Sequence, residues 1–197
     1  MVAMVAVGCA SKAPPSNIHD GCAIFYEKDN WYEAAKTAER RWGTPISVQL
    51  AIIHQESKFD ARAKPRRMRI LGFIPGPRPS TAYGYAQALT TTWAAYVDET
   101  GNWSASRTDF ADATDFVGWY TARTARMNRV SRGDAYNLYL AYHEGDAGYR
   151  RGTYKRKAWL LSTARKVATL ADRYRVQLAR CETRLAEQRR GWFSWSR

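Results

Sequence analysis

The chain has 197 residues, of which 31 are Lys or Arg and 18 are Asp or Glu, so its formal net charge is +13. Hydrophobic residues make up 45% of the chain and aromatic residues 13%, which excludes an intrinsically disordered protein. No uninterrupted apolar run approaches the roughly 20 residues of a membrane-spanning helix, so a transmembrane bundle is excluded too. The positive charge predicts an anionic partner: nucleic acid, membrane lipid, or an anionic polymer such as cell wall.

The N-terminal segment is a short apolar run, residues 1–8, followed by Cys9. It resembles the end of a bacterial lipoprotein signal, in which the cysteine thiol is acylated, although the run is short and no basic residue precedes it. We therefore expect Cys9 to be lipidated. The protein would then be a periplasmic lipoprotein anchored to a membrane, and we expect this to be the outer membrane. The alternative is an ordinary frayed apolar terminus. The polar, proline-containing residues 11–17 are typical of a tether.

Two cysteines remain, Cys22 and Cys181. An even number of cysteines in an exported protein favours a disulfide, here between the start of the domain and its last helix. The alternative is two reduced cysteines buried as small hydrophobic residues. The spacings contain no Cys-x-x-Cys and no His/Cys cluster, so we expect no metal site, and we expect no cofactor.

Apolar residues at helical spacing predict a series of helices along the chain. The first covers residues 30–42 and ends at Gly43, and Pro45 suits the first turn of the second, residues 46–56. Later helices are expected at residues 90–96, 112–128, 134–142 and 158–188. The last of these carries a heptad-like apolar stripe that should pack along the domain or against another helix. The stripe consists of Leu160, Ala164, Val167, Ala171, Tyr174, Leu178, Cys181 and Leu185.

The segment 58–80 differs from its surroundings because it is rich in proline and arginine. A short β-hairpin is expected there, with residues 69–74 and 81–86 flanking the turn-rich Pro75-Gly76-Pro77. We therefore expect a mainly α protein with a small β-hairpin and a long C-terminal helix. Its expected parts are a signal remnant and tether (residues 1–21), a main domain (22–157), and a basic helix with an aromatic tail (158–197), packed on or extending from the domain.

Three short clusters are candidates for chemistry. The first lies at the end of the second helix, where a carboxylate that borders a buried face has a raised pKa and can act as a general acid near neutral pH. Taken alone, a glutamate at a helix end is more simply a solvated surface residue, and the other two clusters are core tyrosines beside turns. The three clusters are Glu56-Ser57, Gly84-Tyr85-Ala86-Gln87 and Ala141-Tyr142-His143-Glu144-Gly145.

Together and in this order, the clusters resemble the motifs of the soluble lytic transglycosylase (SLT) family, relatives of goose-type lysozyme, over roughly residues 45–148. That family typically shows Glu-Ser at a helix end, then Gly-Leu-Met-Gln, then Ala-Tyr-Asn-Ala-Gly. The resemblance implies a lysozyme-like α+β fold for residues 22–157. It also implies cleavage of the β-1,4 bond between N-acetylmuramic acid and N-acetylglucosamine in peptidoglycan, with formation of 1,6-anhydromuramic acid.

The resemblance further implies roles for single residues. Glu56 would be the one catalytic acid and base, Gln87 and Tyr142 would bind the sugar, and Ser57 would support the site. Three other positions depart from the family's pattern and are kept as candidate substrate-binding residues: Tyr85, His143 and Glu144.

Two rival functions remain. One is a hydrolytic muramidase on the same fold, for which Asp60 is a nearby second carboxylate to which we assign no role. The other is a non-catalytic scaffold lipoprotein that binds the cell wall.

The positive charge is concentrated at the C-terminus. Residues 150–197 contain 14 basic and 3 acidic residues, whereas the rest of the chain is close to neutral. The tail with Trp192, Phe193 and Trp195 fits a nucleic-acid-binding surface weakly and a membrane-interface anchor about as well. We interpret the charge as a docking feature for anionic wall or lipid. The expected partners are peptidoglycan glycan strands and a membrane, and no nucleic acid, because an exported protein does not meet it.

Overall fold

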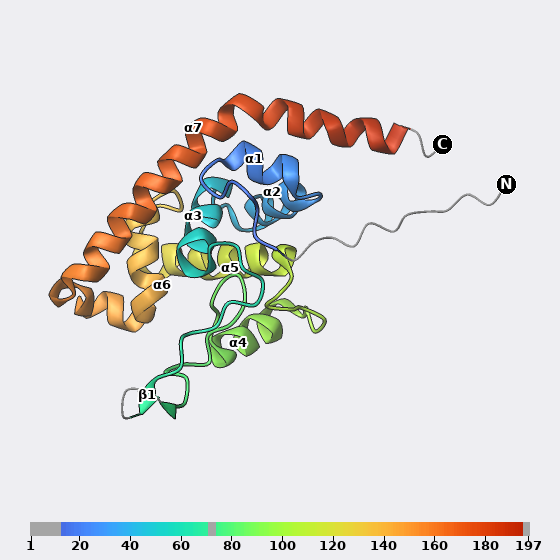
Figure 1. Ribbon diagram of the computed structural model, residues 1–197. Coiled ribbons are helices and arrows are strands. Elements are labelled where there is room, and N and C mark those ends of the chain that lie inside the picture. Colours follow the sequence, from blue (N-terminus) through green and yellow to red (C-terminus); the bar gives the residue numbers. More distant parts are fainter. Residues whose placement is uncertain (1–12, 71–73, 195–197) are drawn as a thin grey trace.

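The structure is a computed structural model, and it describes residues 13–70 and 74–194. Over these residues the protein is mainly α, as the sequence predicts (Figure 1). The elements in chain order are α1 (Gly21–Glu27), α2 (Trp31–Trp42), α3 (Ile46–Ser57), β1 (Arg69–Ile70), β2 (Ile74–Pro75), α4 (Thr90–Thr100), α5 (Phe110–Asn128), α6 (Ala135–Arg150), the 3-10 helix η1 (Thr153–Arg156) and α7 (Ala158–Ser194).

The helix ends follow local capping chemistry. Helix α2 ends at Gly43, whose positive φ of 72° lets its N–H bond to the Glu39 carbonyl, so this boundary agrees with the prediction. Helix α5 begins two residues earlier than predicted because the Asp109 side chain accepts hydrogen bonds from the first free N–H groups of the helix. Helix α6 runs beyond its predicted end as two helical pieces joined at Gly145 (φ 70°, ψ 157°).

The β-hairpin expected between residues 69–74 and 81–86 is not seen. Instead, β1 and β2 form a two-residue antiparallel pair in which Ile70 lies opposite Ile74. Pro75, expected in the turn, belongs to β2. Residues 81–88 curl into a turn closed by a bridge between Tyr83 and Ala88. The reason is that this segment is tied to the body of the protein, where Gly84 N–H bonds to the Ala63 carbonyl at 3.0 Å.

Helix α3 lies at the centre of the core. Ten of its twelve residues are buried, as expected of a helix that is apolar nearly all round. It packs against α2, α5, α6 and α7 (Figure 1). Met127, near the end of α5, is 46% exposed.

Helix α7 runs along the outside of the other helices, past α6 and α3 to α1 (Figure 1). All eight residues of its predicted apolar stripe are buried, so the stripe packs along the domain. None of the helices in the described part of the chain is long and apolar enough to span a membrane. Cys9 and Trp195 lie outside the described residues.

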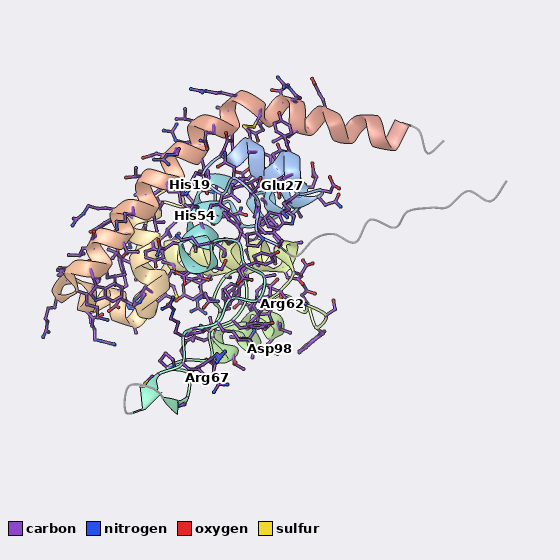
Figure 2. The ribbon with its side chains drawn as sticks, viewed as in Figure 1. His19, Glu27, His54, Arg62, Arg67 and Asp98 are labelled. Atoms are coloured by element: carbon purple, nitrogen blue, oxygen red, sulfur yellow. A yellow bond between two sulfur atoms is a disulfide. The ribbon has the colours of Figure 1, made fainter. Side chains whose placement is uncertain are left out.

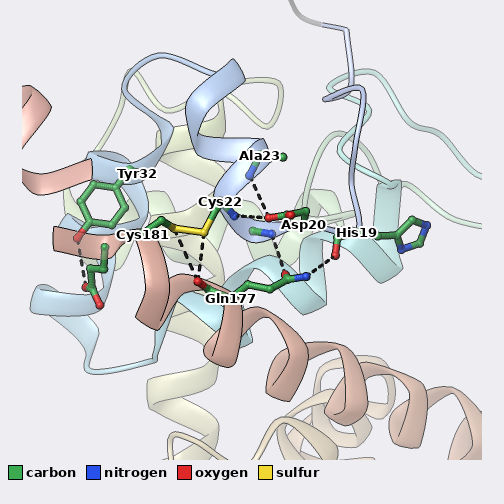
Figure 3. The surroundings of a disulfide bond; sticks show 9 residues. His19, Asp20, Cys22, Ala23, Tyr32, Gln177 and Cys181 are labelled. Atoms are coloured by element: carbon green, nitrogen blue, oxygen red, sulfur yellow. Dashed lines mark hydrogen bonds between the residues drawn. A yellow bond between two sulfur atoms is a disulfide. The ribbon is translucent and has the colours of Figure 1, made fainter. Parts of the chain in front are cut away.

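A disulfide joins Cys22 in α1 to Cys181 in α7, 159 residues apart in the sequence. Figure 3 shows its surroundings, in which Gln177 of α7 accepts a hydrogen bond from Gly21 N–H at 2.9 Å and donates one to the His19 carbonyl. The cross-link and these bonds hold the N-terminal end of the domain against its last helix.

Replacing both cysteines, Cys22→Ser/Cys181→Ser, should lower the free energy of unfolding by about 2–5 kcal/mol, because a cross-link across a long loop restricts the unfolded chain. Urea unfolding followed by circular dichroism measures the change. As a control, a reductant should destabilise the wild type and leave the double variant unaffected. Equal midpoints for the oxidised wild type and the variant would contradict this expectation.

Candidate active site

Glu56 lies in the last turn of α3, half-buried, where two tyrosines of α6 approach it. Burial raises its pKa from 4.5 to about 7, while a hydrogen bond donated by Tyr139 and the charge of Lys58 act in the opposite direction. A carboxyl group with this pKa is protonated in a large fraction of molecules near neutral pH. It can therefore donate a proton and take one back, as general acid–base catalysis requires.

The backbone just after Glu56 is held in an unusual conformation. Lys58 and Phe59 both have positive φ, 54° and 61°, which side chains other than glycine rarely adopt. The Phe59 ring is fully buried and lies 5.8 Å from the His54 ring. Burial of this ring offsets the strain and ends α3 sharply, so Glu56 stands at the rim of the core.

Ser57 forms its hydrogen bond within α3. Its side chain is mostly buried, and its hydroxyl donates to the Ile53 carbonyl at 3.1 Å, one turn earlier in α3. Ser57 thus stabilises the last turn that carries Glu56.

The second cluster forms a tight turn that approaches another loop. A side chain at Gly84 is excluded, because a Cβ there would lie 1.9 Å from the Arg107 carbonyl oxygen. Gln87, also at positive φ, donates from Nε2 to the carbonyls of Ala63 and Gly84, both at 2.9 Å. These contacts join the segment after α3 to the segment before α4.

Tyr85 is placed behind this turn and not on its surface. Its ring is 3% exposed and packs edge-on against Trp31 and Phe110, with ring centres 5.6 and 5.7 Å apart. In this position the ring supports the turn from the core, and its assignment as a substrate contact stays a prediction.

Tyr142 connects the third cluster to the second. Its hydroxyl donates to the Ala86 carbonyl at 2.6 Å, and its ring lies 5.0 Å from that of Tyr120. Burial raises the pKa of Tyr142 far above 10, and the nearby Glu56 carboxylate adds to this effect. Tyr142 therefore lies between Glu56 and the Gly84 turn.

Glu144 is held as a fixed anion inside the fold. Its side chain is 4% exposed and accepts hydrogen bonds from Lys157 at 2.6 Å, from Thr153, and from His143 at 3.1 Å. Burial alone would raise its pKa, but these donors outweigh it and hold the pKa at about 2. The network ties the kink of α6 to η1. The His143 ring is more exposed and packs edge-on against Trp159.

A cavity of about 240 Å³ opens between α4, α5 and α6. Four of the residues expected from the sequence line it: Gln87, Tyr142, His143 and Glu144. The structure thus gathers the second and third clusters at one cavity, and Tyr142 links that cavity to Glu56. In the described residues, no group of three or more His, Cys, Asp or Glu side chains is arranged to hold a metal ion.

Sequence reasoning missed Tyr139, which hydrogen-bonds Glu56 directly and also contacts Gln55. A signal existed, since Tyr139 precedes Tyr142 by three residues and so shares its helix face. It also missed Lys58, whose charge reaches Glu56.

The model of the transglycosylase SLT domain family matches residues 1–181 of the chain. No curated protein matches the chain significantly. The match includes all three clusters and both α3 and α6, which carry the residues around Glu56.

Replacing Gly84 by alanine should destabilise the protein strongly, because the new Cβ would collide with the backbone of Arg107. Gly101→Ala is the matched control, since Gly101 has a similar φ of 70° and open space around it. We expect a loss of about 1–2 kcal/mol for Gly101→Ala, from the backbone conformation alone, and a clearly larger loss for Gly84→Ala. Urea unfolding midpoints compare the two, and equal losses would contradict the close approach.

Proposed function

The chain belongs to the transglycosylase SLT domain family, which indicates lytic transglycosylase activity on peptidoglycan. We propose which bond this activity cleaves and which residue catalyses the cleavage. The bond is the β-1,4 linkage between N-acetylmuramic acid and N-acetylglucosamine, and the residue is Glu56. The observation that carries this proposal is a pKa of about 7 for Glu56, caused by its burial at the end of α3. Such a group supplies both proton transfers of the reaction.

In the proposed reaction, protonated Glu56 gives its proton to the glycosidic oxygen as the bond to the anomeric carbon breaks. The N-acetyl group of muramic acid assists at that carbon. The ionised Glu56 then accepts the proton of the muramic acid 6-hydroxyl, whose oxygen attacks the anomeric carbon. The product is the 1,6-anhydro sugar, and Glu56 ends protonated as it began. Unlike most glycosidases, this route needs no second carboxylate.

The surrounding residues suit this chemistry. Tyr139 donates a hydrogen bond to Glu56, so it orients the carboxyl group and stabilises its ionised form between the two proton transfers. The Tyr142 hydroxyl already donates its hydrogen to the Ala86 carbonyl. It can therefore only accept a hydrogen bond from a sugar hydroxyl. Gln87 lines the same cavity and is proposed as a second sugar contact.

His143 and Glu144 are proposed to act at the edge of this cavity. The negative charge of Glu144 is balanced by Lys157. We therefore assign Glu144 the role of positioning His143 and not that of binding a sugar. His143, with its ring partly exposed at the cavity, is the member of this pair that is placed to meet substrate.

The proposed setting is the periplasm, with Cys9 lipidated and inserted in the outer membrane. The disulfide between Cys22 and Cys181 supports an oxidising compartment. In this arrangement, residues 1–21 are the signal remnant and tether, 22–157 the catalytic domain, and 158–197 a basic helix and tail.

The Glu56→Gln variant should release products from purified sacculi at least about 100-fold more slowly than the wild type, because the acid and base are lost. Glu99→Gln is the matched control, since Glu99 is exposed on α4 and does not line the cavity beside Tyr142. Mass spectrometry of the products reads the outcome. Products carrying an added water would indicate a muramidase, and unchanged release by Glu56→Gln would reject the assignment. Binding to sacculi without release by the wild type would favour a scaffold.

Activity should fall as the pH rises through about 7, because Glu56 must be protonated to act as the acid. Tyr139→Phe removes a hydrogen bond that lowers the pKa of Glu56, so the pKa should rise and the alkaline limb should move to higher pH. The dependence of kcat/KM on pH measures this shift. A limb that stays in place or moves to lower pH would contradict the role of Tyr139.

A further inference from the structure

A second recess, of about 450 Å³, lies on the side of α3 that faces α7. The last turn of α3 and Lys58 just after it form one wall, and α7 from Ser162 to Arg173 forms the other. His19 and His54, which also line it, lie where α7 passes α3 (Figure 2). This recess is separate from the cavity beside Tyr142 and is larger.

The recess is lined by cations and by no acidic residue. Its four cations are Lys58, Arg165, Lys166 and Arg173. Three of them project from α7, where Lys166 and Arg173, seven residues apart, lie on one helix face and Arg165 lies next to that face. Across residues 13–70 and 74–194, no ion pair joins any of the four to a carboxylate. We call this set the basic recess.

The positive groups around the recess repel one another. Desolvation lowers the pKa of Lys58, the charge of Glu56 raises it, and the charge of Lys166 lowers it. Burial lowers the pKa of His54 to about 4, and the charges of Lys58, His19 and Arg173 contribute in the same direction. An anion bound here would relieve this mutual repulsion.

The basic recess adjoins Glu56. Lys58 interacts electrostatically with Glu56 on one side and with Lys166 on the other. Gln55, which lines the recess, also contacts Tyr139, the hydrogen-bond partner of Glu56. A substrate held at Glu56 can therefore extend into the recess past Lys58.

We propose that the basic recess binds the carboxylates of the peptide attached to the muramic acid unit whose bond Glu56 cleaves. This inference rests on the proposed function. The peptide is joined to muramic acid through its lactyl ether, so its carboxylates lie a short distance from the reacting bond. Lysine and arginine form strong charge-assisted hydrogen bonds to carboxylates, and Ser162 and Thr169 in the same wall offer hydroxyls to peptide groups. A flexible peptide can enter a recess that a planar lipid surface cannot.

The test uses the full-length protein and two soluble ligands that differ by one charge. N-acetylmuramyl-L-alanyl-D-glutamate has two free carboxylates, and its isoglutamine form has one of them amidated. Titration calorimetry should show about tenfold tighter binding of the diacid by the wild type. In Lys166→Gln/Arg173→Gln this preference should disappear. In Arg180→Gln/Arg184→Gln, which removes two exposed charges of α7 outside the recess, it should persist.

Equal affinity of the wild type for both ligands would overturn the proposal, as would equal loss of the preference in both variants. A third result would also overturn the proposal: both ligands bind equally, and phosphatidylglycerol vesicles bind the wild type but not Lys166→Gln/Arg173→Gln. That result would assign the recess to lipid. Because binding is measured without cleavage, a wild type that discriminates the ligands but releases nothing from sacculi would support the recess and reject the proposed reaction.

Discussion

The burial of Glu56 at the end of α3 is the constraint on which the site depends. Helix α3 packs against α2, α5, α6 and α7, so a carboxyl group at its last turn borders the core. Loss of hydration raises the pKa of that group to about 7. The strained pair after the helix, Lys58 and Phe59, is tolerated because the Phe59 ring is buried in the same core. The packing that stabilises the protein therefore also raises the pKa of Glu56 into the range of a general acid.

The rest of the site consists of connections between segments far apart in the sequence. Tyr142 joins α6 to the turn that begins at Gly84, and Gln87 joins that turn to Ala63 beyond the end of α3. The ion pair between Glu144 and Lys157 stabilises the kink of α6. The bonds from Tyr142 and Gln87 use a polar side chain to fix backbone, which explains why residues with sequence signals turn out to hold the cavity in shape.

Helix α7 gives the positive charge of the chain a definite place. Its apolar stripe is buried against α1, α3 and α6, and this orientation turns Arg165, Lys166 and Arg173 toward the recess beside Lys58. The disulfide at Cys181 holds the same helix to α1. Composition gives only the net charge of the chain. The structure shows that part of this positive charge lines a recess next to Glu56.

The sequence by itself predicted the helices other than α1, the apolar stripe of α7 and the three clusters, because helical periodicity and short motifs are local properties. It determined the family through those clusters, and the family model matches residues 1–181. Only the tertiary structure decided that Tyr85 faces the core, that Glu144 is tied to Lys157, and that Tyr139 reaches Glu56. It also replaced the expected hairpin by the β1–β2 pair. These outcomes depend on which distant segments meet, and local sequence patterns do not encode those long-range contacts.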